Sequence, residues 1–113
     1  RDTLHDIVEN FYDKVMSDST INYFFEGVNM DMQRAKMKAF LMMALGGPIK
    51  FTGKDVHNAH SKLVDTGLND KHFDAVANHI DSALEEFNVD LSVREEISNV
   101  VEGTRDAVLN RDF

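Results

Sequence analysis

The sequence contains no cysteine among its 113 residues, and this absence removes several kinds of chemistry at once. Without cysteine the chain can form no disulfide, no thiolate metal site and no cysteine nucleophile. Any metal ion would have to be held by His, Asp, Glu, Lys or Met side chains.

Basic residues and long apolar runs are also scarce. The formal net charge is −8, from 12 Lys and Arg against 20 Asp and Glu, and no basic block stands out. Nucleic acid and anionic membrane surfaces are therefore not expected as partners. The longest apolar run, Ala39 to Leu45, is far too short to cross a bilayer, and no signal peptide is visible, so we expect a cytoplasmic protein.

The single proline and the six glycines fall mostly between segments of helical periodicity. No segment alternates at strand period, no repeat is present, and 42% of the residues are apolar, so we expect one all-α domain over residues 1–113. A capping box is predicted at Ser92 and Glu95, at the start of the last helix. The predicted helices cover Thr3–Met16, Met30–Leu45, Asp55–Asp65, Lys71–Phe87 and a last segment from Ser92 to Val108, with a helical turn at Ile21–Phe25.

A histidine occupies the inward stripe of the third predicted helix. Val56, Ala59, His60 and Leu63 lie at spacings i, i+3, i+4 and i+7, so the His60 imidazole should point into the core. An inward imidazole is either a satisfied core histidine or a ligand for something bound. On this segment alone the core histidine is the simpler interpretation.

Polar residues fall on the inward stripes of other helices as well. Tyr12 lies on the first stripe and Gln33 on the second, with Lys36 at its edge. Taken singly, they are explained as a core tyrosine, a boundary glutamine and a solvated lysine. A planar macrocycle with one axial imidazole and a polar pocket opposite would use all of them. Its flat apolar walls would be Phe11, Phe24, Phe25 and Phe40.

A series of short motifs runs along almost the whole chain in the order and spacing of one family. Each motif is weak by itself, but the ordered set resembles the group I truncated haemoglobins. The motifs are Phe11-Tyr12, Ile21–Phe25, Gln33-Arg34-Ala35-Lys36, Leu45-Gly46-Gly47, Gly53-Lys54, Ala59–Leu63, His72–Val76 and Val108-Leu109-Asn110.

The resemblance implies a two-over-two helical sandwich that encloses haem b. It implies His60 as the proximal iron ligand, with Tyr12 and Gln33 as distal donors to dioxygen. Lys36 and Met37 fall at distal positions too, and the haem-packing positions, with His72 near a propionate, are Phe11, Phe25, Phe40, Phe51, Val56 and His72.

Three departures from the family pattern matter. The first helix of the family does not precede Arg1, either because the chain is trimmed or because this lineage lost the helix, and we expect haem retention to suffer. Met37 replaces a glutamine that is common at its position, which removes one distal donor. The region around Thr104 carries no histidine that could bond to haem, so we expect non-covalent attachment.

Neutral His60 would bind iron through one ring nitrogen, and its other N–H would need an acceptor such as a backbone carbonyl of its own helix. Dioxygen bound to ferrous iron becomes partly anionic, so Tyr12 and Gln33 could each donate a bond worth about 1–2 kcal/mol. Together they would slow dioxygen release by roughly one to two decades. Carbon monoxide is less polarised and would gain less.

Four function classes follow from these residues. The first is a monomeric haem protein that carries, stores or senses dioxygen, carbon monoxide or nitric oxide. The second, with the same pocket, is a nitric oxide dioxygenase that needs a separate reductase. The third is a haem-free helical module that binds zinc through His57 and His60, completed by Asp55 or a glutamate. The fourth is a haem-free interaction domain, in which buried Tyr12 and Gln33 would be unexplained costs.

Lys36 generates one prediction at this stage. A neutral lysine amine can ligate iron when no other ligand is present, so we expect a His60–iron–Lys36 form at alkaline pH. The alternative is that Lys36 pairs with a haem propionate. A ferric spectrum of Lys36→Ala that matches the wild type from mildly acidic to alkaline pH would contradict ligation by Lys36.

Overall fold

A computed structural model describes residues 3–46 and 53–111 of the chain. Helices dominate these ranges, and no strand occurs within them, which confirms the all-α expectation. No helix in the described ranges has the length and apolar character needed to cross a membrane. The elements in chain order are α1 (Thr3–Met16), the 3-10 helix η1 (Asn22–Phe25), α2 (Met30–Ala44), α3 (Gly53–Asp65), α4 (Asp70–Glu86), α5 (Leu91–Gly103) and α6 (Arg105–Val108).

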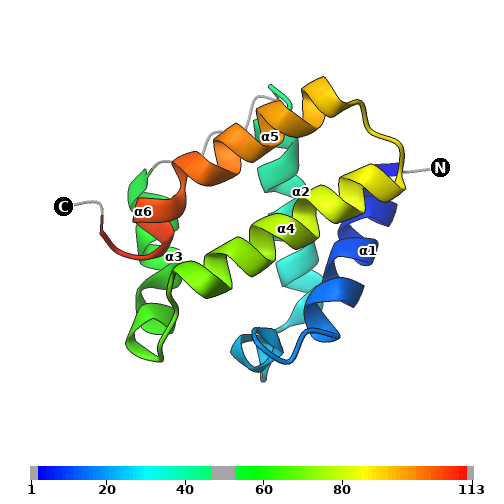
Figure 1. Ribbon diagram of the computed structural model, residues 1–113. Coiled ribbons are helices and arrows are strands. Elements are labelled where there is room, and N and C mark those ends of the chain that lie inside the picture. The colour runs from blue at the N-terminus through cyan, green and yellow to red at the C-terminus, as the bar shows by residue number, and fades with distance from the viewer. Residues whose placement is uncertain (1–2, 47–52, 112–113) are drawn as a thin grey trace.

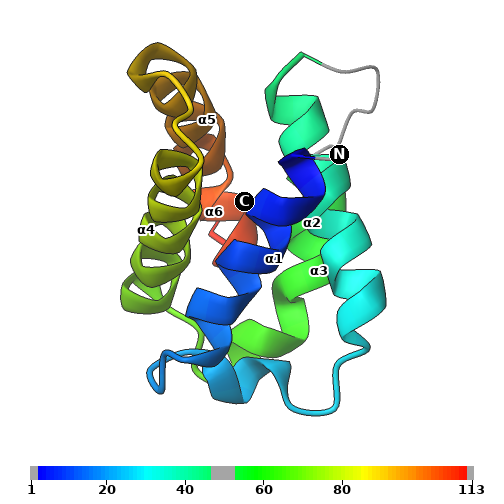
Figure 2. The ribbon, with the colours of Figure 1, turned by 90° about the vertical axis from the view of Figure 1, so that its right-hand side faces the viewer.

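The helices α1, α2, α4 and α5 form two layers, as the two-over-two expectation requires. Figure 1 shows α4 and α5 running side by side, with α3 and α6 together at one end of the molecule. Seen from the side in Figure 2, α1 and α2 make the other layer. Contacts of α1 with α4, and of α2 with α5, join the two layers.

The core lies between these layers and is built from the apolar stripes of the helices. Val15 on α1 and Ala83 on α4 are fully buried, and Ile97 on α5 is 2% exposed. Burying one large aliphatic side chain stabilises the fold by about 1.5–3 kcal/mol. The buried apolar residues are Ile7, Val8, Phe11, Tyr12, Val15, Ile21, Leu41, Phe73, Ile80, Ala83, Leu84, Ile97, Val101, Ala107 and Leu109.

Asparagine side chains cap the N-termini of α2 and α4. The Asn29 side chain accepts a hydrogen bond from Met32 N, and the Asn69 side chain accepts one from Lys71 N at 2.9 Å. His72 completes a capping box, because its Nδ1 accepts from Asn69 N at 3.0 Å. These bonds satisfy amides that would otherwise lack partners in the first turn of each helix.

The last third of the chain differs from the prediction in two respects. The residue that precedes α5 is Asp90 and makes no side-chain cap, so the Ser92–Glu95 capping box is wrong. Ser92 already lies inside the first turn. The predicted continuous last helix is also wrong, since it is interrupted at Thr104. The Thr104 Oγ1 donates to the Val101 carbonyl at 2.6 Å, a side-chain bond that competes with regular helix geometry.

A histidine–aspartate pair ties the loop after α1 to α4. His79 Nε2 lies 2.8 Å from Asp18 Oδ2, and Asp18 Oδ1 accepts from the amide and hydroxyl of Thr20. The Thr20 and His79 hydrogen bonds lower the pKa of Asp18 from 3.8 to about 2. The carboxylate is therefore stabilised in its charged form in the folded chain.

We predict that Asp18→Asn lowers the free energy of unfolding by about 1–2 kcal/mol at pH 7, because charge-assisted bonds are lost. Since the folded pKa lies below the unfolded one, this stabilisation is present above about pH 4 and declines as the pH falls toward 2. Denaturant unfolding across this range measures the difference. Asp13→Asn is the matched control, as Asp13 is exposed and its carboxylate has no partner among the described residues. Equal decreases in the free energy of unfolding in the two variants would contradict a stabilising role for the His79–Asp18 pair.

Candidate functional site

The apolar stripe of α3 is not fully covered by the described chain. Val56, Leu63 and Val64 are half-buried, and they lie outside the described hydrophobic core cluster. Within the described residues, α3 packs extensively only against α6. Ala59 is exposed, so its predicted place on the inward stripe is wrong. The inward face is centred closer to His60, and Ala59 lies at its edge.

His60 lies on this half-buried face with its protonation state defined by one hydrogen bond. The ring Nδ1 is 2.8 Å from the Val56 carbonyl, which can only accept, so Nδ1 carries the proton. This confirms the expected acceptor within its own helix. Burial lowers the pKa of the imidazole, although the bond to Val56 acts in the opposite direction. The ring is therefore neutral near pH 7, and its Nε2 lone pair has no partner among the described residues.

Tyr12 places a hydroxyl inside the opposite layer. Its side chain is 3% exposed and meets the rings of Phe11 and Phe25 edge-on, at centroid distances of 4.7 and 6.0 Å. The hydroxyl donates to the backbone carbonyl of Gln33 at 3.3 Å. Desolvation raises the pKa of Tyr12 to about 12, so the hydroxyl keeps its proton. Tyr12 and Gln33 are thus neighbours, and the Tyr12 hydroxyl interacts with both the main chain and the side chain of Gln33.

The other predicted distal residues follow Gln33 along α2. Gln33 is half-buried, and a hydrogen bond from its side chain to Tyr12 acts to lower the Tyr12 pKa, against the larger effect of burial. Met37 is half-buried against the core cluster. Lys36 is exposed, so its amine would have to turn inward to reach a bound metal. Iron ligation by Lys36 stays a prediction.

The predicted packing residues divide into three groups. Phe11 is 2% exposed and belongs to the protein core, whereas Phe25, Phe40 and Val56 present partly open apolar surface. Phe51 lies outside the described residues. A flat apolar ligand could cover the partly open surface of Phe25, Phe40 and Val56.

His72 has a structural role that the sequence reasoning did not assign. Because Nδ1 accepts from Asn69 N, the neutral ring carries its proton on Nε2, 3.4 Å from the Tyr23 hydroxyl oxygen. Phe24 packs against the ring at 4.9 Å. The signal was available in the sequence, since His72 stands three residues after Asn69, an asparagine just before the predicted helix Lys71–Phe87. Its place near a propionate stays a prediction.

The zinc alternative gains no support from the described residues. They contain no group of three or more His, Cys, Asp or Glu side chains that could hold a metal ion. His60 Nδ1 is engaged with Val56, and the side chain of Asp55 lies outside the described part. The pair His57 and His60 therefore lacks a visible third ligand.

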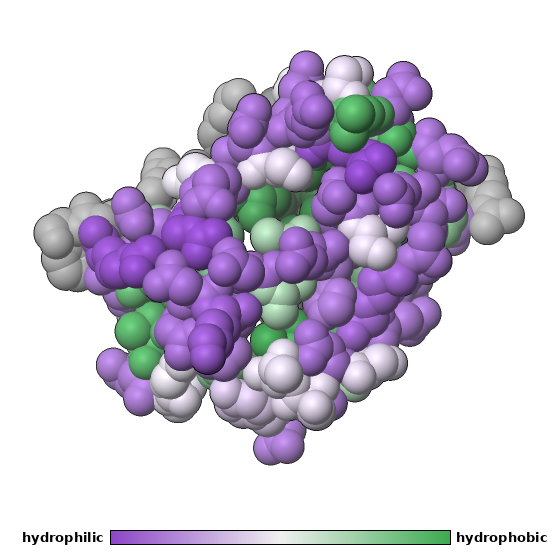
Figure 3. All heavy atoms as spheres, viewed as in Figure 1, coloured by the Kyte–Doolittle hydropathy of each residue, from purple (hydrophilic) through white to green (hydrophobic). Residues whose placement is uncertain are grey.

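A groove between α4 and α5 is separate from these residues. Figure 3 shows apolar atoms at its floor and hydrophilic atoms around it. It has a volume of about 420 Å³ and none of the predicted site residues lines it. Its lining is Asp74, Ala77, Asn78, Ile80, Asp81, Ser98, Val101, Glu102 and Arg105.

The residues around His60 fit an iron porphyrin better than they fit a closed core. A neutral imidazole with an available nitrogen is the form that binds iron. The half-buried apolar surface of α3 suits a flat apolar ring, and a buried hydroxyl and a half-buried amide suit a small polar ligand. A cofactor-free core would leave this apolar surface of α3 and the His60 Nε2 lone pair without a partner among the described residues.

Comparison with known proteins agrees with this fit. Residues 1–110 match the family described as bacterial-like globin. The chain is 43% identical over 94 residues to a group 1 truncated haemoglobin of Synechocystis sp.. The aligned region covers 82% of this chain and 76% of that protein. The chain is also 40% identical over 110 residues to a group 1 truncated haemoglobin of Chlamydomonas moewusii. The aligned region covers 97% of this chain but only 64% of the length of that relative.

Solved structures of this class have the same fold. The 2/2 haemoglobin of Synechococcus sp. PCC 7002, in the cyanomet state with covalently attached haem, superposes with a TM-score of 0.88 at 38% identity, over 96% of this chain and 90% of that one. The ferric truncated haemoglobin of Tetrahymena pyriformis gives 0.82 at 35% identity, over 94% and 88%. Matching most of the family model and most of these chains, the protein belongs to the bacterial-like globins and is a group 1 truncated haemoglobin.

Proposed function

We propose that this globin binds haem b without a covalent bond and uses His60 as the iron ligand. The observation that carries the proposal is the 2.8 Å bond from His60 Nδ1 to the Val56 carbonyl. It holds the ring in one tautomer and one orientation and leaves Nε2 as the nitrogen that can donate electrons to iron. Haem, when bound, supplies the metal at which a diatomic gas binds.

Non-covalent attachment is supported by where the histidines fall. The five histidines are His5, His57, His60, His72 and His79, and neither α5 nor α6 contains one. The covalent haem of the Synechococcus relative is a property of that protein. A covalent bond from a histidine of the last helices is therefore not available to this chain.

Tyr12 and Gln33 supply the distal side in this proposal. The Tyr12 hydroxyl stays protonated, and its bond to the Gln33 carbonyl is 3.3 Å, longer than the usual 2.7–2.8 Å for O–H···O. A hydroxyl held this weakly can turn to a better acceptor at small cost. A polarised dioxygen ligand is such an acceptor, and the Gln33 amide is a second donor nearby.

The first test is the optical spectrum of the haem-loaded protein. We expect His60→Ala to change the ferric, ferrous and carbonmonoxy spectra and to speed haem loss, because the axial nitrogen is gone. His57→Ala, one turn earlier on the same helix, is the control and should keep the wild-type spectra. Unchanged spectra in His60→Ala, or stoichiometric zinc in purified protein that lacks a Soret band, would overturn the proposal.

The second test concerns the distal donor. Tyr12→Phe should speed dioxygen dissociation by about tenfold, since a buried hydrogen bond to a partly charged ligand is worth about 1.4 kcal/mol. Carbon monoxide dissociation should change much less. Rapid mixing of the dioxygen complex with carbon monoxide measures the rate, and Tyr23→Phe, a 45% exposed tyrosine, is the control. Equal rates in Tyr12→Phe and wild type would remove Tyr12 from the distal role.

A further inference from the structure

The helix that carries His60, α3, packs mainly against a very short helix. Within the described residues, α3 has its extensive contacts with α6, which is only four residues long. Figure 1 shows α6 lying against α3 at one end of the molecule. Ala107 in α6 and Leu109 directly after it are 7% and 6% exposed, so buried apolar side chains anchor this short helix. Whatever fixes α6 therefore also fixes α3.

Asn110 connects the two helices directly. It follows the end of α6 in the left-handed region, with φ of 59°, a conformation that asparagine tolerates better than most residues. Its Nδ2 donates to the Ala107 carbonyl at 3.2 Å, which closes its own helix. The same nitrogen lies 3.2 Å from the His57 carbonyl, 53 residues away in sequence.

The acceptor on α3 lies in the turn that orients the imidazole. The His57 carbonyl directly follows the Val56 carbonyl, which accepts from His60 Nδ1. Two neighbouring carbonyls of one turn therefore hold the His60 ring and the Asn110 amide. A shift of this turn relative to α6 would move the ring with it.

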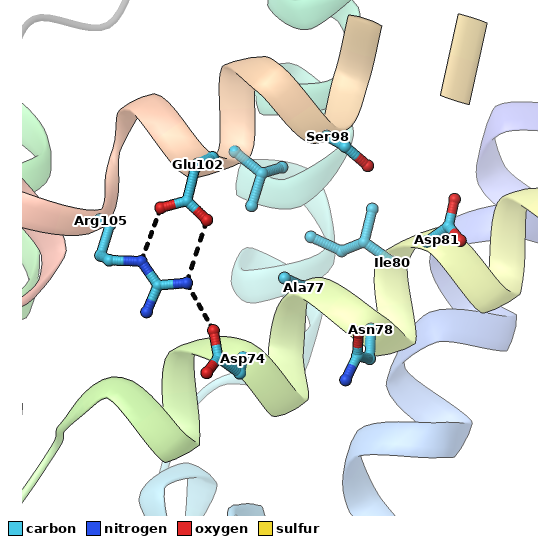
Figure 4. Close-up of a pocket in the computed structure, with 9 residues that line it drawn as sticks. Asp74, Ala77, Asn78, Ile80, Asp81, Ser98, Glu102 and Arg105 are labelled. Carbon is cyan, nitrogen blue, oxygen red and sulfur yellow. Dashed lines mark hydrogen bonds and ion pairs between the residues drawn. The ribbon is translucent and has the colours of Figure 1, made fainter. Parts of the chain in front are cut away.

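The position of α6 is in turn set by Arg105 at its first residue. The guanidinium bonds Asp70 and Asp74 on α4 and Glu102 on α5, and it lies 4.4 Å from the ring centroid of Phe73. Figure 4 shows Arg105 between Glu102 and Asp74. A planar guanidinium with several partners on two helices resists sliding in any direction. Contacts therefore run from α4 and α5 through α6 to α3.

We propose that Asn110 is a positioning residue for His60, because its amide holds the α3 turn that presents the imidazole to the haem iron. The inference rests on the proposed role of His60. The hydrogen bond from Asn110 to α3 can be tested in the haem-free protein as well. A result against this hydrogen bond is therefore distinguishable from a result against haem ligation by His60.

A second asparagine provides a matched control. Asn88 follows α4 with the same φ of 59°, yet it is exposed, and no bond to α3 is found for it in the described chain. Glycine adopts this φ without strain, so Asn110→Gly and Asn88→Gly each remove one amide and leave the backbone free to keep its shape. Asn110→Asp is a near-isosteric second variant that replaces the donor nitrogen by an oxygen.

The first measurement is amide hydrogen exchange in the haem-free protein. We expect Asn110→Gly and Asn110→Asp to speed exchange in α3 by about fivefold relative to wild type, the effect of losing one hydrogen bond. Exchange in α1 should not change. Asn88→Gly should leave α3 at the wild-type rate.

The second measurement is the iron–imidazole stretching band in the resonance Raman spectrum of the ferrous, ligand-free protein. It should shift or broaden in both Asn110 variants and stay at the wild-type position in Asn88→Gly. A band and an α3 exchange rate equal to wild type in the Asn110 variants would overturn the proposal. So would the same changes in Asn88→Gly, since Asn110 would then be an ordinary helix cap.

Discussion

The hydrogen bond between the His60 ring and the Val56 carbonyl fixes the tautomer and the orientation of the imidazole that α3 carries. A carbonyl can only accept, so it selects the tautomer, and a bond within one helical turn leaves the ring little freedom to rotate. Burial keeps the imidazole neutral. The haem binding proposed for His60 has two further requirements: the turn must stay in place, and the other side of the cofactor must be suitably polar.

The fold meets these requirements with different parts of the chain. The layer of α1 and α2 brings the Tyr12 hydroxyl to Gln33, and tight packing around Tyr12 keeps that hydroxyl protonated. On the side of His60, α3 packs against α6, which is held by the charged cluster around Arg105. Most of the described apolar core lies on α1, α4 and α5 and includes no residue of α3, so the helix that carries His60 contributes little to that core, whereas Phe11 and Tyr12 belong to it.

The sequence predicted those features in which one residue conflicts with its local pattern. His60 and Tyr12 stood on apolar stripes where a polar group needs a reason, so both could be found by periodicity alone. Features that depend on the meeting of distant segments could not. The bond from Asn110 to His57 spans 53 residues, and Arg105 meets Asp70 and Asp74 across more than 30. Nothing in a local window signals either contact.

Local patterns also failed where small geometric details decide the outcome. The Ser92–Glu95 spacing suits a capping box, but the helix begins at Leu91, so the cap position is Asp90 and Ser92 lies two residues after it. Ala59 was placed inward by a stripe that fits its spacing, although the face that α3 buries is rotated toward His60. The first error is a shift of two residues along the chain, and the second is a rotation by a fraction of a turn.

The half-covered face of α3 has a consequence for the life of the protein. A ligand that binds only the folded form stabilises it by mass action, and here the ligand would cover surface that the described chain leaves open. Newly made chains would therefore be most vulnerable to proteases before they acquire porphyrin, with α3 as the first region to open. The amount of this globin that accumulates would then follow the supply of haem as well as the rate of its synthesis.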